Sequence, residues 1–274
     1  MNPDLIPQIP GWLLLVFGVV AFLYLGGPLL TYVNLRQSAD PNVVRLEASQ
    51  QALLPAGIRD YLERVENELR VCGFERVDDV ALPNQVPNVA ANLRLFLHRE
   101  NQDFANCTAA YSKIGNTWGE RLKYVAFTTY FRNGTTFGTS NLSIPGCFPP
   151  RPNYRSTKFR TAQSAGELYA LHRAVISDEA RTGTKELPLL DRFGGDAAAY
   201  IRWTMLAEMQ DATNSGCLYL NEKEGKYLPT VIGAIVMTWK QLWPWKLFLV
   251  RANDRKAAEI VARQQSEGMA QIFS

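Results

Sequence analysis

The longest run of apolar positions lies near the N-terminus. Residues 11–33 read GWLLLVFGVVAFLYLGGPLLTYV and contain no charged side chain. About 20 apolar residues at ~1.5 Å rise per residue match the hydrocarbon core of a bilayer, and a helix satisfies its own backbone there. Trp12 and Tyr32 flank the run, and such amphipathic rings favour the headgroup level. The pattern predicts a transmembrane helix over residues 11–33, after a short outer tail at residues 1–10.

A cleaved signal peptide is the main alternative to an anchor. The first ten residues hold Asp4 and no Lys or Arg, the apolar run is longer than a signal core, and no A-x-A site follows it. Basic residues flank only the C-terminal side of the run, at Arg36 and Arg45. The positive-inside rule therefore places the N-terminus outside and the rest of the chain in the cytoplasm. The expected location is the cell inner membrane.

The pattern after the anchor changes from apolar to amphipathic. Residues 34–54 predict a helical or loose stalk, and residues 55–228 an α+β domain. A helix is expected from Pro55 to about Val71, with Gly73 as its stop. Its apolar positions recur at helical spacing, at Ile58, Leu62, Val65 and Leu69.

A strand-rich block follows that helix. Strands are expected over residues 74–82, 93–97, 106–114, 122–131 and 135–141, where β-branched, aromatic or alternating positions dominate. Asn133-Gly134 predicts a type I′ hairpin turn between the last two. Residues 145–162 form a Pro-rich connector, helices are expected from about Ala165 to Arg181 and from the N-cap Asp196 to about Asn214, and residues 217–228 form a short hairpin. The fold class is α+β, with an antiparallel sheet and helices on one face.

The C-terminal segment combines tryptophan with basic residues. Residues 229–265 predict one amphipathic, membrane-contacting helix before a tail at residues 266–274, and residues 238–264 hold six basic and two acidic residues. A helix packed on the sheet or on a partner, and a second span, are the alternatives. The second span is disfavoured by Lys240, Lys246 and Pro244. The predicted membrane-interface residues are Trp12, Tyr32, Trp239, Lys240, Trp243, Trp245, Lys246 and Arg251.

Charge and cysteine content narrow the function classes only slightly. The 274-residue chain has a net charge of +3, and no repeat or low-complexity tract, so nucleic acid is not an expected partner. Its four cysteines are scattered without a C-x-x-C pair. The connector carries a basic, aromatic strip that is either a partner surface or a solvated linker, formed by Arg151, Tyr154, Arg155, Lys158 and Arg160.

No motif predicts catalysis, a cofactor or a metal. The chain has two histidines, His98 and His172, and lacks H-E-x-x-H, G-x-S-x-G and P-loop patterns. His172 shares an apolar helix face with Leu168 and Ile176, which indicates a structural residue. Gly194-Gly195 before a helix fits capping better than phosphate binding.

The sequence therefore predicts a non-catalytic, single-pass accessory or scaffold subunit of a larger membrane protein complex, with its domain on the cytoplasmic face. Its expected partners are membrane lipids and other membrane-protein subunits. Two alternatives stay open. One is a membrane-tethered domain that binds a ligand or a lipid headgroup between the Thr-rich strands and the basic connector. The other is a thiol-dependent enzyme, which would need a cysteine sulfur within hydrogen-bond reach of His98 or His172.

Overall fold

The fold is α+β, with mostly antiparallel sheets and helices, as the sequence predicts. The computed structural model describes residues 10–86, 89–114, 117–182 and 189–272, so the outer tail expected at residues 1–10 lies almost wholly outside them. The chain forms two compact units that interleave along the sequence. Unit 1 comprises Met1–Ala39, Pro145–Pro149 and Ala212–Phe248, and unit 2 comprises Asp40–Ile144, Pro150–Asp211 and Leu249–Ser274.

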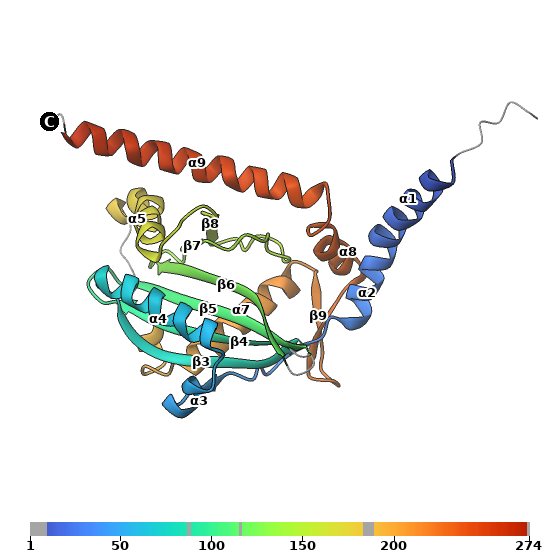
Figure 1. Cartoon of the computed structure of the whole chain (residues 1–274), viewed down its shortest axis with the longest axis horizontal. Helices are drawn as coiled ribbons and strands as arrows, with labels where there is room; N and C mark the ends of the chain where they lie inside the picture. The colour runs from blue at the N-terminus through green and yellow to red at the C-terminus, as the bar shows by residue number, and fades with distance from the viewer. Residues whose placement is uncertain (1–9, 87–88, 115–116, 183–188, 273–274) are drawn as a thin grey trace, which may run out of the picture. The chain divides into compact units, whose positions relative to one another are not determined.

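Unit 1 combines the N-terminal helix with a small sheet (Figure 1). The N-terminal helix consists of α1 (Gly11–Ala21), a π-helical turn η2 (Phe22–Gly26) and α2 (Gly27–Asn34). The hairpin expected at residues 217–228 is confirmed as β9 (Leu218–Asn221) and β10 (Lys226–Pro229). The sheet is completed by β1 (Gln37–Ser38), which pairs with β10, and α8 (Val231–Trp239) follows it.

The stalk expected at residues 34–54 is more ordered than predicted. Besides β1, it contains β2 (Val44–Arg45), which pairs with β3, and α3 (Ala48–Ala52). The sequence gives little sign of these strands because each is two residues long. They exist because sheet edges elsewhere in the chain supply their backbone partners.

Unit 2 is built on a seven-stranded sheet in the order β2-β3-β4-β5-β6-β7-β8. Neighbours are antiparallel except β7 and β8, which are parallel. β8 lies inside the Pro-rich connector, where the sequence pattern predicts no strand. The strands from β3 to β7 match the predicted block, and their bounds are β3 (Glu75–Val86), β4 (Val89–His98), β5 (Asp103–Ile114), β6 (Thr117–Tyr130) and β7 (Thr136–Ser140). The unpredicted strand β8 spans Tyr154–Lys158.

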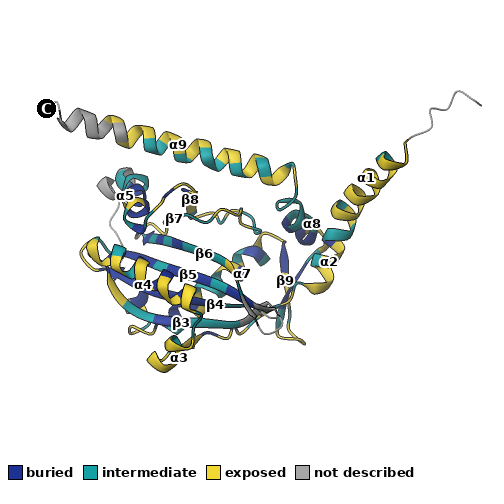
Figure 2. Cartoon of the chain, viewed as in Figure 1, coloured by how far each residue is buried: buried dark blue, intermediate teal, exposed yellow. Residues whose placement is uncertain are grey.

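Helices cover both faces of this sheet, so the prediction of helices on one face is wrong (Figures 1 and 2). On one face lie α4 (Ala56–Val71), α5 (Ala165–Thr182) and part of α9 (Trp245–Ile272). On the other lie α6 (Leu189–Arg192) and α7 (Ala197–Asn214). The physical reason is visible in β4, where every residue from Asn92 to His98 is buried. Arg94 and His98 alternate with the leucines of this strand, and both are buried as well.

The predicted hairpin between β6 and β7 is confirmed, but its turn type is wrong. Gly134 has φ +82°, whereas Asn133 is not among the residues with positive φ, as a type I′ turn requires. The Phe131 amide donates to the Thr135 carbonyl, which leaves a three-residue loop. The Asn133 side chain accepts a hydrogen bond from the Thr135 amide at 2.9 Å, so asparagine acts here through its side chain.

Two predicted helix boundaries are confirmed by their hydrogen bonds. The Ala199 amide donates to the Asp196 carboxylate at 3.0 Å at the start of α7. At the end of α4, Gly73 has φ +86°, its amide donates to the Arg70 carbonyl, and the Phe74 amide donates to the Leu69 carbonyl. This is a Schellman motif, which requires the left-handed conformation that glycine adopts without strain.

The segment expected as one helix over residues 229–265 forms two. α8 ends at Trp239 and α9 begins at Trp245, and α9 continues through the expected tail to Ile272. Pro244 lies in the turn between them, where its missing N–H costs no helical hydrogen bond. At nine residues, α8 is too short to cross a bilayer.

Candidate membrane-contacting site

One N-terminal helix among the described residues is long and apolar enough to cross a membrane, from Gly11 to Asn34. Only 6% of its most apolar stretch is buried in the structure, and Figure 2 shows α1 exposed along its length. A core helix of a soluble domain would be covered by other elements. Trp12 and Tyr32 are exposed near the two ends. The helix is therefore a span or a signal sequence by its length and composition.

Pro28 removes one backbone hydrogen-bond donor from this helix. Proline has no N–H, so it cannot donate the i→i−4 hydrogen bond to the carbonyl of Tyr24. The chain is π-helical from Phe22 to Gly26, next to this position. The indole N–H of Trp239 in α8 donates to the Tyr24 carbonyl at 3.0 Å, and the two rings lie 6.0 Å apart. A side chain from the far end of the sequence thus supplies a hydrogen bond that Pro28 cannot.

A second contact joins α8 to α2, about two helical turns further along the N-terminal helix. The hydroxyls of Thr31 and Thr238 are hydrogen-bonded at 2.8 Å. A Cβ at Gly27 would lie 3.0 Å from Thr238 Cγ2, so glycine permits the close approach. The sequence pattern singled out Trp239 but not Tyr24, Thr31 or Thr238. Pro28 identifies the carbonyl that loses its partner, and only the tertiary structure identifies the donor.

The turn after α8 is anchored by its polar side chains and exposes its aromatic ones. Lys240 Nζ donates to the Phe148 carbonyl at 2.8 Å, and Gln241 Nε2 donates to the Pro145 carbonyl at 3.1 Å. Trp243 is 74% exposed, and Trp245, the first residue of α9, is 51% exposed. The structure therefore gives the predicted interface residues of this turn different roles, since Lys240 holds the turn and the two tryptophans extend from it.

The remaining predicted interface residues lie on α9. Lys246 and Arg251 are both exposed. Beyond Phe248 the helix belongs to unit 2, where Ala257, Ile260 and Val261 pack against the core. The later part of α9 therefore matches the alternative of a helix that packs on the sheet.

The basic strip predicted as a partner surface is largely engaged within unit 2. Arg151 pairs with Asp211 and Arg160 with Asp254. Lys158 Nζ donates to the Ile144 carbonyl. The Tyr154 hydroxyl lies over Gly138, where a Cβ would approach it to 1.9 Å, and Arg155 lies 5.4 Å from the Phe137 ring centroid. Arg155 is exposed, so it is the member most available to a partner.

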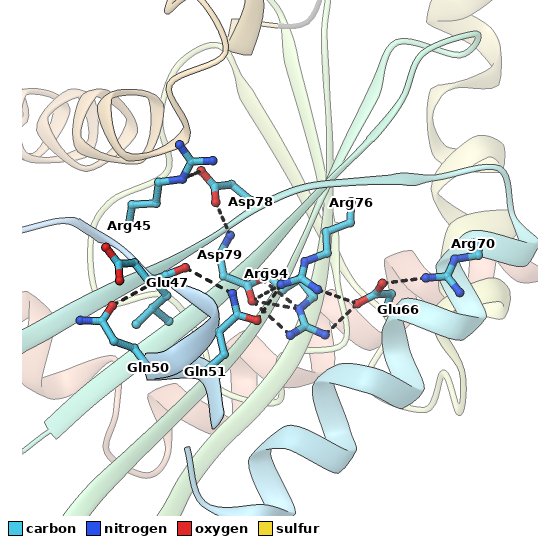
Figure 3. Close-up of polar contacts among 11 residues, drawn as sticks. Arg45, Glu47, Gln50, Gln51, Glu66, Arg70, Arg76, Asp78, Asp79 and Arg94 are labelled. Carbon is cyan, nitrogen blue, oxygen red and sulfur yellow. Dashed lines mark hydrogen bonds and ion pairs between the residues drawn. The ribbon is translucent and has the colours of Figure 1, made fainter. Parts of the chain in front are cut away.

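A buried ionic cluster, which sequence reasoning missed, joins α4 to β3 and β4 (Figure 3). Arg94 Nε donates to Asp79 at 2.9 Å, and Arg94 NH1 donates to Glu66 at 2.8 Å. Arg76 completes the cluster, with an N–H that donates to Asp79 at 2.7 Å. Burial lowers the pKa of Arg94, but its bonds to Asp79 and the charge of Glu66 outweigh this, so the pKa is raised. Two cations and two anions balance, which fits a structural brace.

A second buried cluster surrounds Asp103, which is fully buried. Its carboxylate accepts hydrogen bonds from Thr129 at 2.6 Å, Tyr169 at 2.9 Å and Arg173 at 3.0 Å. Burial and the charge of Asp103 raise the pKa of Tyr169, so its hydroxyl stays a donor.

His172 bridges two strands beside Asp103. Its ring nitrogens lie 2.8 Å from Thr129 Oγ1 and 2.9 Å from Thr139 Oγ1. The prediction of a structural histidine is confirmed for its setting, because His172, Leu168 and Ile176 are all fully buried. Two of the threonines expected around a ligand pocket are thus occupied by this side chain.

None of the described cysteines forms a disulfide. Burial raises the pKa of Cys107 to about 12, and burial followed by the charge of Glu68 raises the pKa of Cys72. Both are neutral at pH 7, whereas a nucleophilic cysteine needs a lowered pKa. Cys107 is also fully buried.

No protein-family model, no curated protein and no solved structure matches this chain, so the site rests on its own geometry.

Proposed function

We propose that the protein is a non-catalytic, single-pass membrane subunit whose α+β domain lies on the cytoplasmic face and serves a larger membrane assembly as an accessory or scaffold part. The supporting observation is the exposed apolar helix Gly11–Asn34, to which α8 of the same chain is hydrogen-bonded. A cleaved leader would leave the Trp239 indole and the Thr238 hydroxyl without these partners, which favours a retained anchor over a signal sequence.

The non-catalytic part is supported by the state of the ionisable groups. Asp79, Asp103 and His172 are bound to partners within the fold, and the Cys107 thiol is buried and neutral at pH 7. Groups held in this way stabilise the fold, and a buried, protonated thiol is not a nucleophile.

Extraction and sizing of the full chain test this proposal. Native membranes would be washed with alkaline carbonate and then solubilised in mild detergent, and the particle mass measured with its co-purifying proteins. We expect the chain to resist carbonate and to elute as a particle larger than one protomer. Release by carbonate would contradict the anchor, and a strict monomer without co-purifying protein would contradict the accessory role.

Orientation needs a separate measurement. Tags at the two termini would be exposed to protease in sealed inner-membrane vesicles of both orientations. We expect the C-terminal tag to be cleaved only from the cytoplasmic side, because Arg36 and Arg45 follow the span and no basic residue precedes it. Cleavage from the other side would reverse the topology.

A further inference from the structure

We infer that α8, the turn that follows it and the first residues of α9, together residues 231–248, form a second membrane contact that reaches into the headgroup region and the adjoining acyl chains of an anionic bilayer. This surface is called the α8 lobe below. The inference rests on the proposed function, because it needs the N-terminal helix to be a retained span.

The depth of the α8 lobe follows from where it is attached to the span. The 21 residues from Gly11 to Thr31 rise about 30 Å, which is the thickness of a hydrocarbon core. Thr31 therefore lies near the boundary of the hydrocarbon core at the C-terminal end of the span, and Tyr24 lies about 10 Å inside that boundary. Since α8 is bonded to both residues, its Trp239 end is carried into the acyl region.

The chemistry of the Tyr24 carbonyl supports the same placement. In lipid, a backbone carbonyl that loses its helical donor has no water to replace it, and leaving it unpaired costs several kcal/mol. Pro28 removes that donor and Trp239 supplies one at 3.0 Å. In water, this pairing would matter little, because solvent would satisfy the carbonyl.

The exposed residues of the α8 lobe match the bilayer interface. Val231 and Ile232 are 63% and 71% exposed, the turn adds the exposed ring of Trp243, and the start of α9 adds those of Trp245 and Phe248. Residues 231–248 contain Lys240 and Lys246 and no acidic residue. Aromatic rings beside cations and without acids fit headgroup depth on an anionic leaflet.

The first experiment measures lipid contact directly. The full chain is reconstituted into mixed phosphatidylcholine–phosphatidylserine vesicles, and tryptophan quenching by brominated phospholipid is compared between variants. We expect W243F/W245F to lower the quenchable signal by about half, because it removes two of four membrane-placed tryptophans, the others being Trp12 and Trp239. The matched control, W203F, replaces a 40% exposed tryptophan of α7 and should leave the quenchable signal unchanged.

The outcomes separate this inference from the proposed function. A chain that resists carbonate, but whose quenching is unchanged by W243F/W245F, would overturn the α8 lobe and leave the anchor intact. A chain that carbonate releases and whose W12F variant is quenched no less than the parent would overturn the anchor, and the inference with it.

A second experiment tests the Pro28–Trp239 pairing. T31C and T238C would be combined and their disulfide formation followed in membranes, with each single variant as a control for the native cysteines. W239F should slow cross-linking several-fold in the parent, and less in a P28A background, where residue 28 can again donate to the Tyr24 carbonyl. An equal effect of W239F in both backgrounds, or no cross-link in the parent, would overturn the docking of α8 on the span.

Discussion

Arg94 and Arg70 contact the same carboxylate but differ in burial. The side chain of Arg94 is 6% exposed and that of Arg70 is 67% exposed, and both pair with Glu66 at 2.8 Å. Removal of a buried partner leaves a charge without compensation, at a cost of about 3–5 kcal/mol, whereas an exposed pair contributes about 0–1 kcal/mol. R94A should therefore lower the free energy of unfolding strongly and R70A hardly at all, as measured by urea denaturation in detergent. Similar losses in both would show that Arg94 is not a brace.

Two glycines with the same backbone conformation differ in what lies above them. Gly73 has φ +86° and Gly134 has φ +82°, but a Cβ at Gly73 would lie 2.9 Å from His98 Nε2, while that of Gly134 would meet open space. G134A should cost about 1–2 kcal/mol from its left-handed conformation alone. G73A should cost more, because it also displaces His98. Equal losses of thermal stability in the two variants would mean that the His98 side chain moves aside without cost.

The ionisation of Cys107 gives a prediction at alkaline pH. Folding raises the pKa of this thiol from the ordinary 9.0 to about 12, so the folded state binds the proton more tightly than the unfolded state. Its contribution to stability is complete below about pH 9 and is lost as pH rises toward 12. Between pH 8 and pH 10.5, the parent should lose about 2 kcal/mol more than C107A, which has no thiol to ionise. Parallel pH profiles in denaturation would contradict this.

At the scale of elements, α9 closes an open edge of the seven-stranded sheet. β8 is the last strand of that sheet, and Asn253 of α9 accepts from the Lys158 amide at 2.9 Å and donates to the Lys158 carbonyl at 2.7 Å. One side-chain amide thus replaces the two backbone bonds of a neighbouring strand. Such cover prevents an edge from pairing with other chains.

Asn253 can be tested without disturbing the helix. N253A should speed amide hydrogen exchange at Lys158 by about five- to thirtyfold, because a donor–acceptor pair worth about 1–2 kcal/mol is lost. R251A on the same helix changes an exposed side chain and should leave that exchange rate unchanged. Unchanged exchange in N253A would indicate that the edge is protected by other parts of α9.

At the scale of the whole molecule, the chain leaves unit 1 and re-enters it, so the N-terminal helix and α8 belong to the same unit. All strands of the seven-stranded sheet lie after residue 40, whereas α8 depends on Tyr24 and Thr31. Deletion of residues 1–35 should therefore raise hydrogen exchange in α8 and leave β4–β6 unchanged. The intact chain in the same detergent is the control. Loss of protection throughout the sheet would show that unit 2 needs the anchor to fold.

Sequence periodicity by itself determined most elements of this protein. The uncharged run at residues 11–33, the helical spacing from Ile58 to Leu69, the strand block and the caps at Gly73 and Asp196 all depend on local chemistry. These features persist in the structure because each depends on residues that are close in the sequence, or only on whether the surroundings are apolar or aqueous.

Only the tertiary structure decided which polar groups meet. The two-residue strands β1 and β2 exist because distant edges pair with them, and Arg94 is buried because Glu66 and Asp79 compensate its charge. Pro28 indicates that the Tyr24 carbonyl loses its helical donor, but the donor that replaces it is Trp239, more than 200 residues away. Periodicity describes a residue's own element, and such partners come from elements that packing alone brings together.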